Sequence, residues 1–351
     1  MKNSKQIAVG NVLVGGGAPI AIQSMTTTKT SDVAATVRQI DRLTMAGCEI
    51  IRVAVPDKAS ALAIEQIKAD TTIPIVADIH FDHTLALLAI ERGVDKIRIN
   101  PGNIGNAQKV RAVADAAKAR NIPIRIGVNG GSLEPDIVQA HGHTPMAMAE
   151  SALRHIALLN RWDFDNICLS VKSSTVADTI RAYRLLRERT SYPLHLGVTE
   201  AGTSYMGTIK NAIAIGSLLL DGIGDTLRVS LTDDPVEEIR AARAILQAIG
   251  LRQFGINLVS CPMCGRCEID LITLAKEVEQ KLAPITVPIT VAVMGCAVNG
   301  PGEAKAADYG IACGKGEGLL FCKGQISHKM PLENLADALV DLIKKDVMST
   351  T

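Results

Sequence analysis

Short apolar runs rich in β-branched residues alternate with helical segments through most of this 351-residue chain. Eight runs have this character: IAIQSM, EIIRVAV, PIVADIH, KIRINP, PIRIGVN, NICLSVKSS, PLHLGVTEAG and DTLRVSLT. Repeated strand–helix units favour a parallel sheet, and eight of them are the number that closes a barrel of the TIM type. We therefore predict an α/β fold with a (β/α)8 barrel over residues 1–250.

The rhythm changes beyond about Leu251 to a strand, a helix, several strands and a final helix over Leu332–Asp346. This order predicts a second, smaller domain of α+β type over residues 251–351. At the other end, the run IAVGNVLVGGGAPIAI is broken by Asn11 and by Gly15, Gly16 and Gly17. It predicts a β-hairpin whose second arm continues into Ile20–Met25, rather than a secretion signal.

The charge balance argues against a polyanionic partner. The chain has 37 basic and 36 acidic residues, a formal net charge of +1 and only 3% aromatic residues. Neither a field that attracts nucleic acid or a membrane surface nor a platform for stacking bases is expected. No stretch approaches the length of a membrane span. Eight cysteines without an export signal favour a cytoplasmic protein.

Polar residues recur on one face of the predicted strands. In KIRIN, Arg98 and Asn100 share a face because side chains alternate along a strand, and the isoleucines take the other face. The polar pair therefore points into the barrel. The same face pattern is shared by further residues, which are Asp78 and His80, Ser170 and Lys172, Arg228 and Ser230, Arg125 and Asn129, and Arg52.

These inward residues carry an excess of positive charge. Each one alone is explained as part of an internal ion pair. The five cations together, however, outnumber the carboxylates Asp78 and Glu200, and burying unpaired cations is very costly. We therefore expect an anionic ligand, and arginine forks suit the oxygens of a phosphate or diphosphate ester. His195 lies deeper in its strand and is predicted to be a hydrogen-bonded core histidine.

A second motif, VSCPMCGRCEID, contains Cys261, Cys264 and Cys267. A CxxC turn presents two thiolates to one metal centre. Cys296 is a further candidate, because it follows the apolar run VPITVAVMG and opens the Gly- and Pro-rich turn CAVNGPGEA. The spacing alone leaves a structural zinc and a redox-active iron–sulfur cluster open. The other cysteines are predicted to be buried and structural, and they are Cys48, Cys168, Cys313 and Cys322.

Three segments, GVNGGSL, CPMCGRCEIDLI and GCAVNGPGEA, resemble the bacterial 4-hydroxy-3-methylbut-2-enyl diphosphate synthases of the methylerythritol phosphate route to isoprenoids. The resemblance covers essentially the whole chain, in the short form without an inserted middle domain. It implies a barrel that binds 2-C-methyl-D-erythritol 2,4-cyclodiphosphate and a small iron–sulfur domain with a 4Fe-4S cluster. It also implies reductive ring opening and dehydroxylation of that substrate, with flavodoxin or ferredoxin as the electron donor.

The resemblance assigns residues in both domains. The cluster ligands correspond to Cys261, Cys264, Cys296 and Glu303, whereas Cys267 stands where the family commonly has another residue. A carboxylate ligand would be harder and more exchangeable than a thiolate. Glu303 and Glu200 are the implied catalytic residues. The implied substrate-binding residues are Arg52, Asp78, His80, Arg98, Asn100, Arg125, Asn129, Lys172, Arg228 and Ser230.

Chain geometry suggests a homodimer. The last helix of a (β/α)8 barrel returns to the face opposite the active site, and here it ends near Ile249, shortly before Cys261. About ten residues reach at most roughly 33 Å when fully extended. We therefore expect the cluster of one subunit to face the barrel of the other, as the resemblance also implies.

Three other functions remain open at this point. One is a phosphate-ester transferase or lyase barrel, similar to pterin-binding synthases, with a structural zinc knuckle. Another is a non-catalytic zinc-ribbon adaptor for a protein or nucleic acid, which the near-zero net charge and the inward cations oppose. The last is radical S-adenosylmethionine chemistry, although the sequence lacks the usual CxxxCxxC motif.

Overall fold

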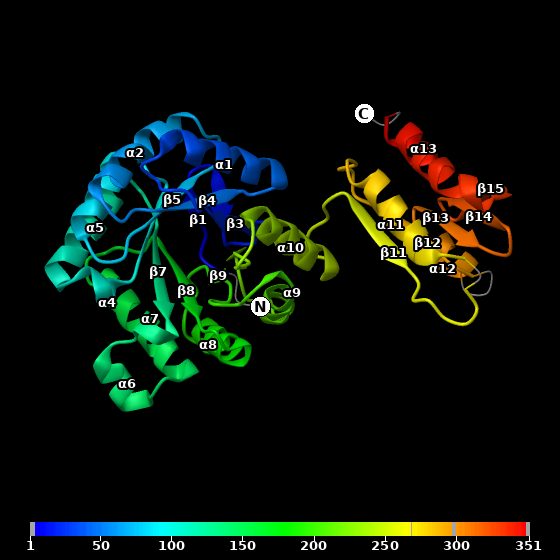
Figure 1. Cartoon of the computed structure of the whole chain (residues 1–351). Helices are drawn as coiled ribbons and strands as arrows, with labels where there is room; N and C mark the ends of the chain where they lie inside the picture. The colour runs from blue at the N-terminus through cyan, green and yellow to red at the C-terminus, as the bar shows by residue number, and fades with distance from the viewer. Residues whose placement is uncertain (1–3, 268, 297–299, 349–351) are drawn as a thin grey trace. The chain divides into compact units, whose positions relative to one another are not determined.

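The computed structural model describes residues 4–267, 269–296 and 300–348, without the side chains of Pro101, Pro301, Glu303 and Met348. The chain divides into two units, Met1–Leu251 and Arg252–Thr351. The first is a parallel barrel ringed by helices and the second is a smaller α+β unit, so the predicted fold class is confirmed (Figure 1).

Eight parallel strands form the barrel. Their order is β8-β7-β6-β5-β4-β3-β10-β9, and a parallel bridge between Leu169 and Leu194 links β8 to the start of β9. The strands are β3 (Ala21–Met25), β4 (Ile50–Ala54), β5 (Ile75–Asp78), β6 (Lys96–Ile99), β7 (Ile124–Asn129), β8 (Ile167–Lys172), β9 (His195–Leu196) and β10 (Thr226–Leu227). The last two are much shorter than the predicted runs.

Helices surround these strands (Figure 1). Asp32 and Asp57 cap the first two helices by accepting hydrogen bonds from Ala35 N and Ser60 N, and Gly47 ends the first in a left-handed conformation. The helices of the ring are α1 (Val33–Ala46), α2 (Lys58–Ala69), α3 (His83–Glu91), α5 (Ala107–Ala119), α7 (Pro145–Asn160), α8 (Val176–Arg189), α9 (Ser204–Leu220) and α10 (Pro235–Ala248).

The N-terminal hairpin is separate from the barrel strands. It consists of β1 (Ile7–Val9) and β2 (Val12–Val14), so the prediction that its second arm continues to Met25 is wrong. Three consecutive glycines with positive φ follow Val14 and turn the chain away. The hairpin packs against inward residues at the amino-terminal ends of the barrel strands. The apolar cluster formed by hairpin and strands together comprises Ile7, Val9, Val14, Ala21, Ile50, Val76 and Cys168.

Additional short elements follow two of the strands at their carboxyl ends, where barrel enzymes build their sites. Asn100 caps α4 (Pro101–Ile104) after β6. After β7 come the 3-10 turn η1 (Gly130–Ser132) and α6 (Pro135–His141), which packs beside α7 (Figure 1).

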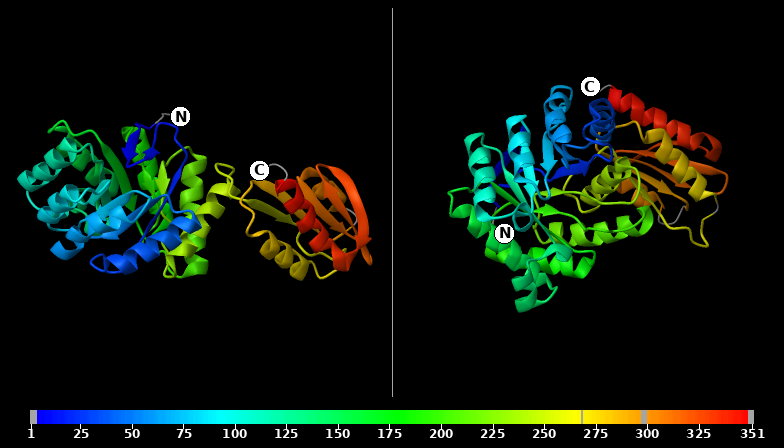
Figure 2. Two further views of the ribbon diagram at one scale, coloured as in Figure 1. Left: turned by 90° about the horizontal axis from the view of Figure 1, so that it is seen from above. Right: turned by 60° about the vertical axis from the view of Figure 1, so that its left-hand side comes forward.

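The second unit has a five-stranded sheet in the order β11-β12-β13-β14-β15. The first three strands are parallel and the last two antiparallel. Helices α11 and α13 share one hydrophobic core with the sheet, and the short α12 packs in another, a helix that the sequence did not predict (Figure 2). The elements are β11 (Ile256–Ser260), α11 (Leu271–Leu282), β12 (Ile289–Met294), α12 (Gly300–Ala306), β13 (Tyr309–Cys313), β14 (Glu317–Cys322), β15 (Gln325–Pro331), η2 (Leu332–Asn334) and α13 (Leu335–Met348).

Within the described residues, every helix is too short or too polar to cross a membrane.

Candidate functional site

A cavity of about 260 Å³ opens at the carboxyl ends of the barrel strands. It brings together all the residues predicted to bind substrate except Asn100. Alternation along β6, β7 and β8 turns every second side chain inward, which explains why residues far apart in the sequence meet here. The lining residues are Met25, Arg52, Asp78, His80, Arg98, Arg125, Asn129, Ser170, Lys172, Val198, Thr199, Arg228 and Ser230.

Asp78 is the carboxylate at the centre of this cavity. Its oxygens lie 3.0 Å from Arg98 Nη1, 3.7 Å from Arg52 Nε and 3.5 Å from His80 Nε2. Burial by itself would raise the pKa of Asp78, but Arg52, the hydrogen bond with His80 and Arg98 together lower it well below its usual range. Asp78 is therefore ionised and holds two arginine side chains in place.

Glu238 is a second carboxylate, which the sequence analysis missed. It reaches in from α10, is only 3% exposed, and pairs with Arg228 at 3.0 Å. It also accepts hydrogen bonds from Ser24 Oγ at 3.2 Å and from Leu231 N at 3.1 Å. The available signal was an acidic residue in the first turn of the helix after the last strand, but acidic first turns are common in helices.

Arg125 and Lys172 form no ion pair among the described residues, although both are buried. Nε and Nη1 of Arg125 have no hydrogen-bond partner there either. Burial, together with the charge of Arg98, lowers the pKa of Arg125 to about 10. Burial and the neighbouring arginines, Arg125 first among them, also lower the pKa of Lys172. Unpaired buried cations of this kind fit an anionic ligand.

Met25 is another residue that sequence reasoning missed. Its sulfur accepts contacts from Nε and Nη2 of Arg52 at 3.1 and 3.0 Å, and it lies 3.8 Å from Arg228 Nη1. The inward face of β3 thus supplies a soft acceptor between two guanidinium groups. A methionine in an apolar strand gives no sequence signal for this contact.

Asn100 and Glu200 lie beside the cavity. Asn100 Oδ1 accepts from Gly102 N at 3.2 Å as the cap of α4, and its Nδ2 lies 3.4 Å from Ser132 Oγ. Glu200 lines an adjoining cavity of about 520 Å³, which shares Asn129 and Thr199 with the first. The φ angle of Glu200 is 54°, an uncommon conformation for a residue of this type that is often found at functional sites.

His195 lies deeper in the barrel and is fully buried. Its Nδ1 lies 2.8 Å from Thr226 Oγ1, as befits a hydrogen-bonded core histidine. Burial and the charges of Arg125, Lys172 and Lys96 lower the pKa of His195 well below its usual value. The ring is therefore neutral.

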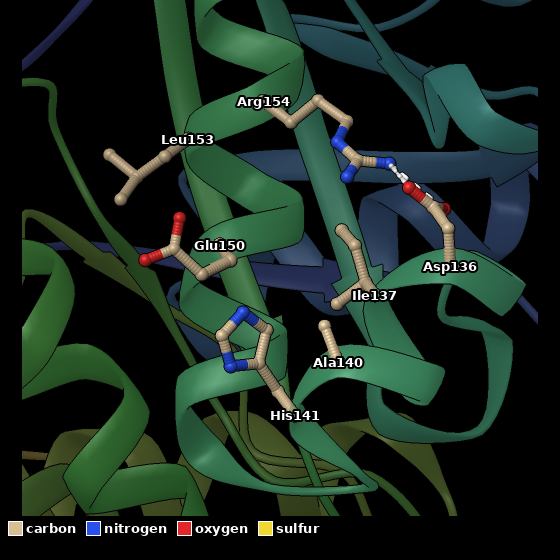
Figure 3. Close-up of a pocket in the computed structure, with 7 residues that line it drawn as sticks. All are labelled: Asp136, Ile137, Ala140, His141, Glu150, Leu153 and Arg154. Carbon is tan, nitrogen blue, oxygen red and sulfur yellow. Dashed lines mark hydrogen bonds and ion pairs between the residues drawn. The ribbon is translucent and has the colours of Figure 1, made fainter.

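A third cavity, of about 420 Å³, lies between α6 and α7 (Figure 3). Arg154 and Asp136 face each other there at 2.8 Å. Glu150, also in the wall, pairs with Arg189 of α8. These charges are satisfied within the protein, and the lining includes none of the predicted site residues. We assign it no role.

The cysteine motif lies in the second unit, where the parallel strands β11 and β12 end side by side. Ser260 pairs with Val293, so Cys261 and Cys296, just beyond these strands, fall at the same edge of the sheet. The Gly295 N–H donates to Cys261 Sγ at 3.4 Å. Cys264 is exposed, and hydrogen bonds from the backbone and side chain of Arg266 lower its pKa.

The other candidate ligand residues and the remaining cysteines are placed as follows. Cys267 N donates to Cys264 O at 2.9 Å, and Cys267 Sγ lies 3.4 Å from Ile269 O, where the partly buried residue packs against the core. Glu303 falls in α12, with its side chain outside the described residues. Cys48, Cys168 and Cys313 are buried, but Cys322 is partly exposed, contrary to its prediction, because it ends β14 beside Asp346.

Two thiols at one sheet edge, one of them supported by a backbone donor, and a third in the turn that follows suit a metal centre with sulfur ligands. Among the residues that the structure describes, no three His, Cys, Asp or Glu side chains already surround a common metal position.

Solved structures resemble the barrel. Dihydropteroate synthase from Yersinia pestis aligns with a TM-score of 0.50 at 13% identity, covering 69% of this chain and 97% of that one. An N-acetylneuraminic acid synthetase from Leptospira borgpetersenii aligns with a TM-score of 0.51 at 15% identity, covering 71% and 91%. At such low identity the likeness shows the fold alone.

Curated relatives match almost the entire length. A protein named 4-hydroxy-3-methylbut-2-en-1-yl diphosphate synthase (flavodoxin) from Geobacter sulfurreducens is 58% identical over 343 residues, 97% of each chain. The protein of the same name from Clostridium perfringens is 56% identical over 98% of this chain and 99% of its own. Residues 4–243 match the GcpE TIM-barrel domain and residues 257–345 match the GcpE protein C-terminal domain. Because both units match over nearly their full lengths, the chain belongs to the GcpE family.

Proposed function

We propose that this chain catalyses the reductive ring opening and dehydroxylation of 2-C-methyl-D-erythritol 2,4-cyclodiphosphate to 4-hydroxy-3-methylbut-2-enyl diphosphate. The relatives that are more than half identical carry the name of this synthase. The observation that carries the proposal within the site is the pair of buried cations, Arg125 and Lys172, that have no carboxylate partner in the described part of the chain. A cyclic diphosphate supplies the missing negative charge.

The reaction fixes what the site must do. Two electrons and one proton enter, the tertiary C–O bond to phosphate breaks, and one hydroxyl leaves as water while a double bond forms. Arg98, Arg125 and Lys172 bind the diphosphate, because charged hydrogen bonds to phosphate oxygens are strong in a water-poor cavity. Asp78 and Glu238 do not touch the anion in this scheme. They orient the guanidinium groups of Arg98 and Arg228.

Glu200 is the proposed proton donor for the departing hydroxyl. It lines the cavity that joins the cationic one, so the carbon skeleton and its hydroxyl groups would lie between the two. The positive φ at Glu200 holds its backbone in a conformation that the surrounding structure must impose. Such fixed placement is useful for a group that must protonate one hydroxyl among several.

Cys261, Cys264, Cys296 and Glu303 are the residues that would hold a 4Fe-4S cluster. The donor set fits, because Cys261 and Cys296 lie just beyond two neighbouring strands, Cys264 is in the turn after Cys261, and Gly295 N–H already supports Cys261. When bound, the cluster supplies electrons and a Lewis-acidic iron. Flavodoxin is the proposed electron donor, as in the names of the relatives.

We further propose a homodimer in which the cluster unit of one subunit serves the barrel of the other. Residues 249–255 alone join α10 to β11, a link of roughly 25 Å at full extension. In a (β/α)8 barrel that link starts at the face opposite the active site. The reducing cytoplasm is the proposed compartment, because thiolate ligands persist there.

Anaerobic preparation tests the function directly. The protein should be brown, contain about four irons and four sulfides per chain, and convert the cyclodiphosphate in the presence of reduced flavodoxin. Mass spectrometry identifies the product. A colourless protein with one zinc and no sulfide would instead support the phosphate-ester transferase or lyase with a structural zinc knuckle.

A further inference from the structure

Two inward-facing positions near the cavity carry no side chain. Gly127 follows Arg125 by two residues in β7, and Gly197 follows His195 by two residues just past β9. Because side chains alternate along a strand, any side chain at either position would point into the barrel. The space that it would need is occupied by a cation of the site.

Arg98 lies against Gly127. A Cβ added at Gly127 would stand 2.9 Å from Nη2 and 3.0 Å from Cζ of Arg98, and closer still to Nε. Arg98 Nη2 donates to the Gly127 carbonyl oxygen at 3.3 Å while Nη1 donates to Asp78 at 3.0 Å. The nearest atoms all belong to the guanidinium group of Arg98, which is buried and hydrogen-bonded to Asp78 and to the Gly127 carbonyl, so it cannot move aside freely. An alanine would therefore push the whole guanidinium by roughly 1 Å.

Lys172 lies against Gly197 in a similar way. A Cβ added there would stand 2.6 Å from Lys172 Nζ and 3.3 Å from its Cε, and also 2.6 Å from the carbonyl oxygen of Arg228. The neighbour at Gly197 is thus partly backbone, whereas at Gly127 it is side chain alone. This difference gives the two positions different expected responses to mutation.

We propose that Gly127 and Gly197 are positioning residues of the anion site, which fix where Arg98 and Lys172 hold their charges by leaving those places free of a side chain. With side chains at these positions, both cations would be displaced toward the axis of a cavity of only about 260 Å³ and take space from the ligand. The identity of that ligand, the cyclodiphosphate, rests on the proposed function.

A mutant cycle tests the first position. Gly127→Ala should lower Tm and reduce kcat/KM by about 10²-fold, as a displacement of roughly 1 Å can do, with iron content unchanged. Calorimetry without turnover should show the same variant binding the cyclodiphosphate more weakly. The double variant Gly127→Ala/Arg98→Ala should match Arg98→Ala in Tm, binding and rate, because the methyl group fits the space left by the arginine.

Control variants sharpen this test. Gly216→Ala in α9, where an added Cβ meets nothing within 4 Å, should keep wild-type kinetics and ligand binding, with a Tm no lower than that of the wild type because alanine favours a helix interior. At the second position, Lys172→Ala should relieve Gly197→Ala only in part, because the Arg228 carbonyl remains and because the φ angle of Gly197, 158°, is one that residues with a side chain rarely adopt.

Two results would overturn the proposal. One is a double variant whose losses in Tm and affinity equal the sum of the losses in Gly127→Ala and Arg98→Ala; the other is wild-type binding of the cyclodiphosphate by Gly127→Ala. If Gly127→Ala does not fold, folding of the double variant supports the proposal and its failure to fold overturns it. The stability part of the cycle needs no substrate. It therefore stands even if a different anion proves to be the ligand.

Discussion

Lys96 places a charge inside the barrel, below the cavity. It shares the inward face of β6 with Arg98, is fully buried, and its Nζ has no hydrogen-bond partner among the described residues. Burial is the main reason that the pKa of Lys96 falls to about 8. Cys168 raises this pKa by less than burial lowers it, and the charges of Arg125 and Arg52 lower it further. The folded protein therefore carries the cost of this charge at neutral pH.

Replacing Lys96 should stabilise the protein in a pH-dependent way. Lys96→Met should raise the free energy of unfolding near pH 7 by up to about 3 kcal/mol. The lysine titrates near 10.5 when unfolded and about 8 when folded, so between these values the unfolded state binds more protons and the wild type gains stability as pH rises. The advantage of the variant should shrink across that window. Denaturant unfolding of both proteins near pH 7, 9 and 10.5 measures it, and a constant difference would contradict the account.

The cations that line the cavity should govern substrate affinity. Arg98→Ala and Arg125→Ala should each raise KM by about 10- to 150-fold, equivalent to losing a charged hydrogen bond of about 1.5–3 kcal/mol. Arg184→Ala removes a guanidinium that pairs with Asp221 on the surface, and it should leave KM unchanged. Steady-state kinetics decides the matter. If both cavity variants behave like the surface one, the two arginines are structural.

The turn from Cys261 to Cys267 contains one more thiol than the proposed ligand set uses. Cys267 is partly buried, with Sγ near Ile269 O and against Gly295, and the proposed fourth ligand is Glu303 instead. Cys267→Ser should keep both the iron content and the turnover rate of the wild type. Glu303→Ala should hold a cluster that is less stable and should lose most of the turnover rate.

Glu303→Cys separates ligation from catalysis. A thiolate binds iron more tightly than a carboxylate and is harder to displace, so iron content should persist while turnover falls much further. Iron analysis beside the rate assay gives the ratio. If Glu303→Ala keeps its full iron content while Cys267→Ser contains no iron, the cluster has four cysteine ligands.

Strand periodicity predicted the barrel and most of its inward residues, because alternation is a local property of the chain. It predicted Arg98 and Lys172 as neighbours in one cavity from positions far apart in sequence. It failed where contacts come from elsewhere in space. Glu238 arrives from a helix, Met25 looks like ordinary core, and nothing in a sequence says which glycine faces an arginine. The strands β9 and β10 are shorter than the predicted runs, because apolar composition does not reveal where the backbone hydrogen bonds between neighbouring strands end.

Mixing inactive variants tests the proposed dimer. Lys172→Ala removes a cation of the barrel and Cys296→Ser removes a thiol of the second unit, so each homodimer should be inactive. In a mixed dimer one site would combine an intact barrel with the intact second unit of the partner, and part of the activity should return. Subunit exchange is verified by differential tagging. No recovery despite exchange would mean that each site is built within one chain.

The hairpin β1–β2 has a consequence for traffic through the enzyme. Its apolar residues Ile7, Val9 and Val14 seal the lower end of the barrel against Ile50 and Val76, so solutes have no path through that end. Substrate must therefore enter, and product leave, through the same opening at the carboxyl ends of the strands. Product that has not yet left blocks binding of the next substrate molecule, so the diphosphate product should be a competitive inhibitor with respect to substrate.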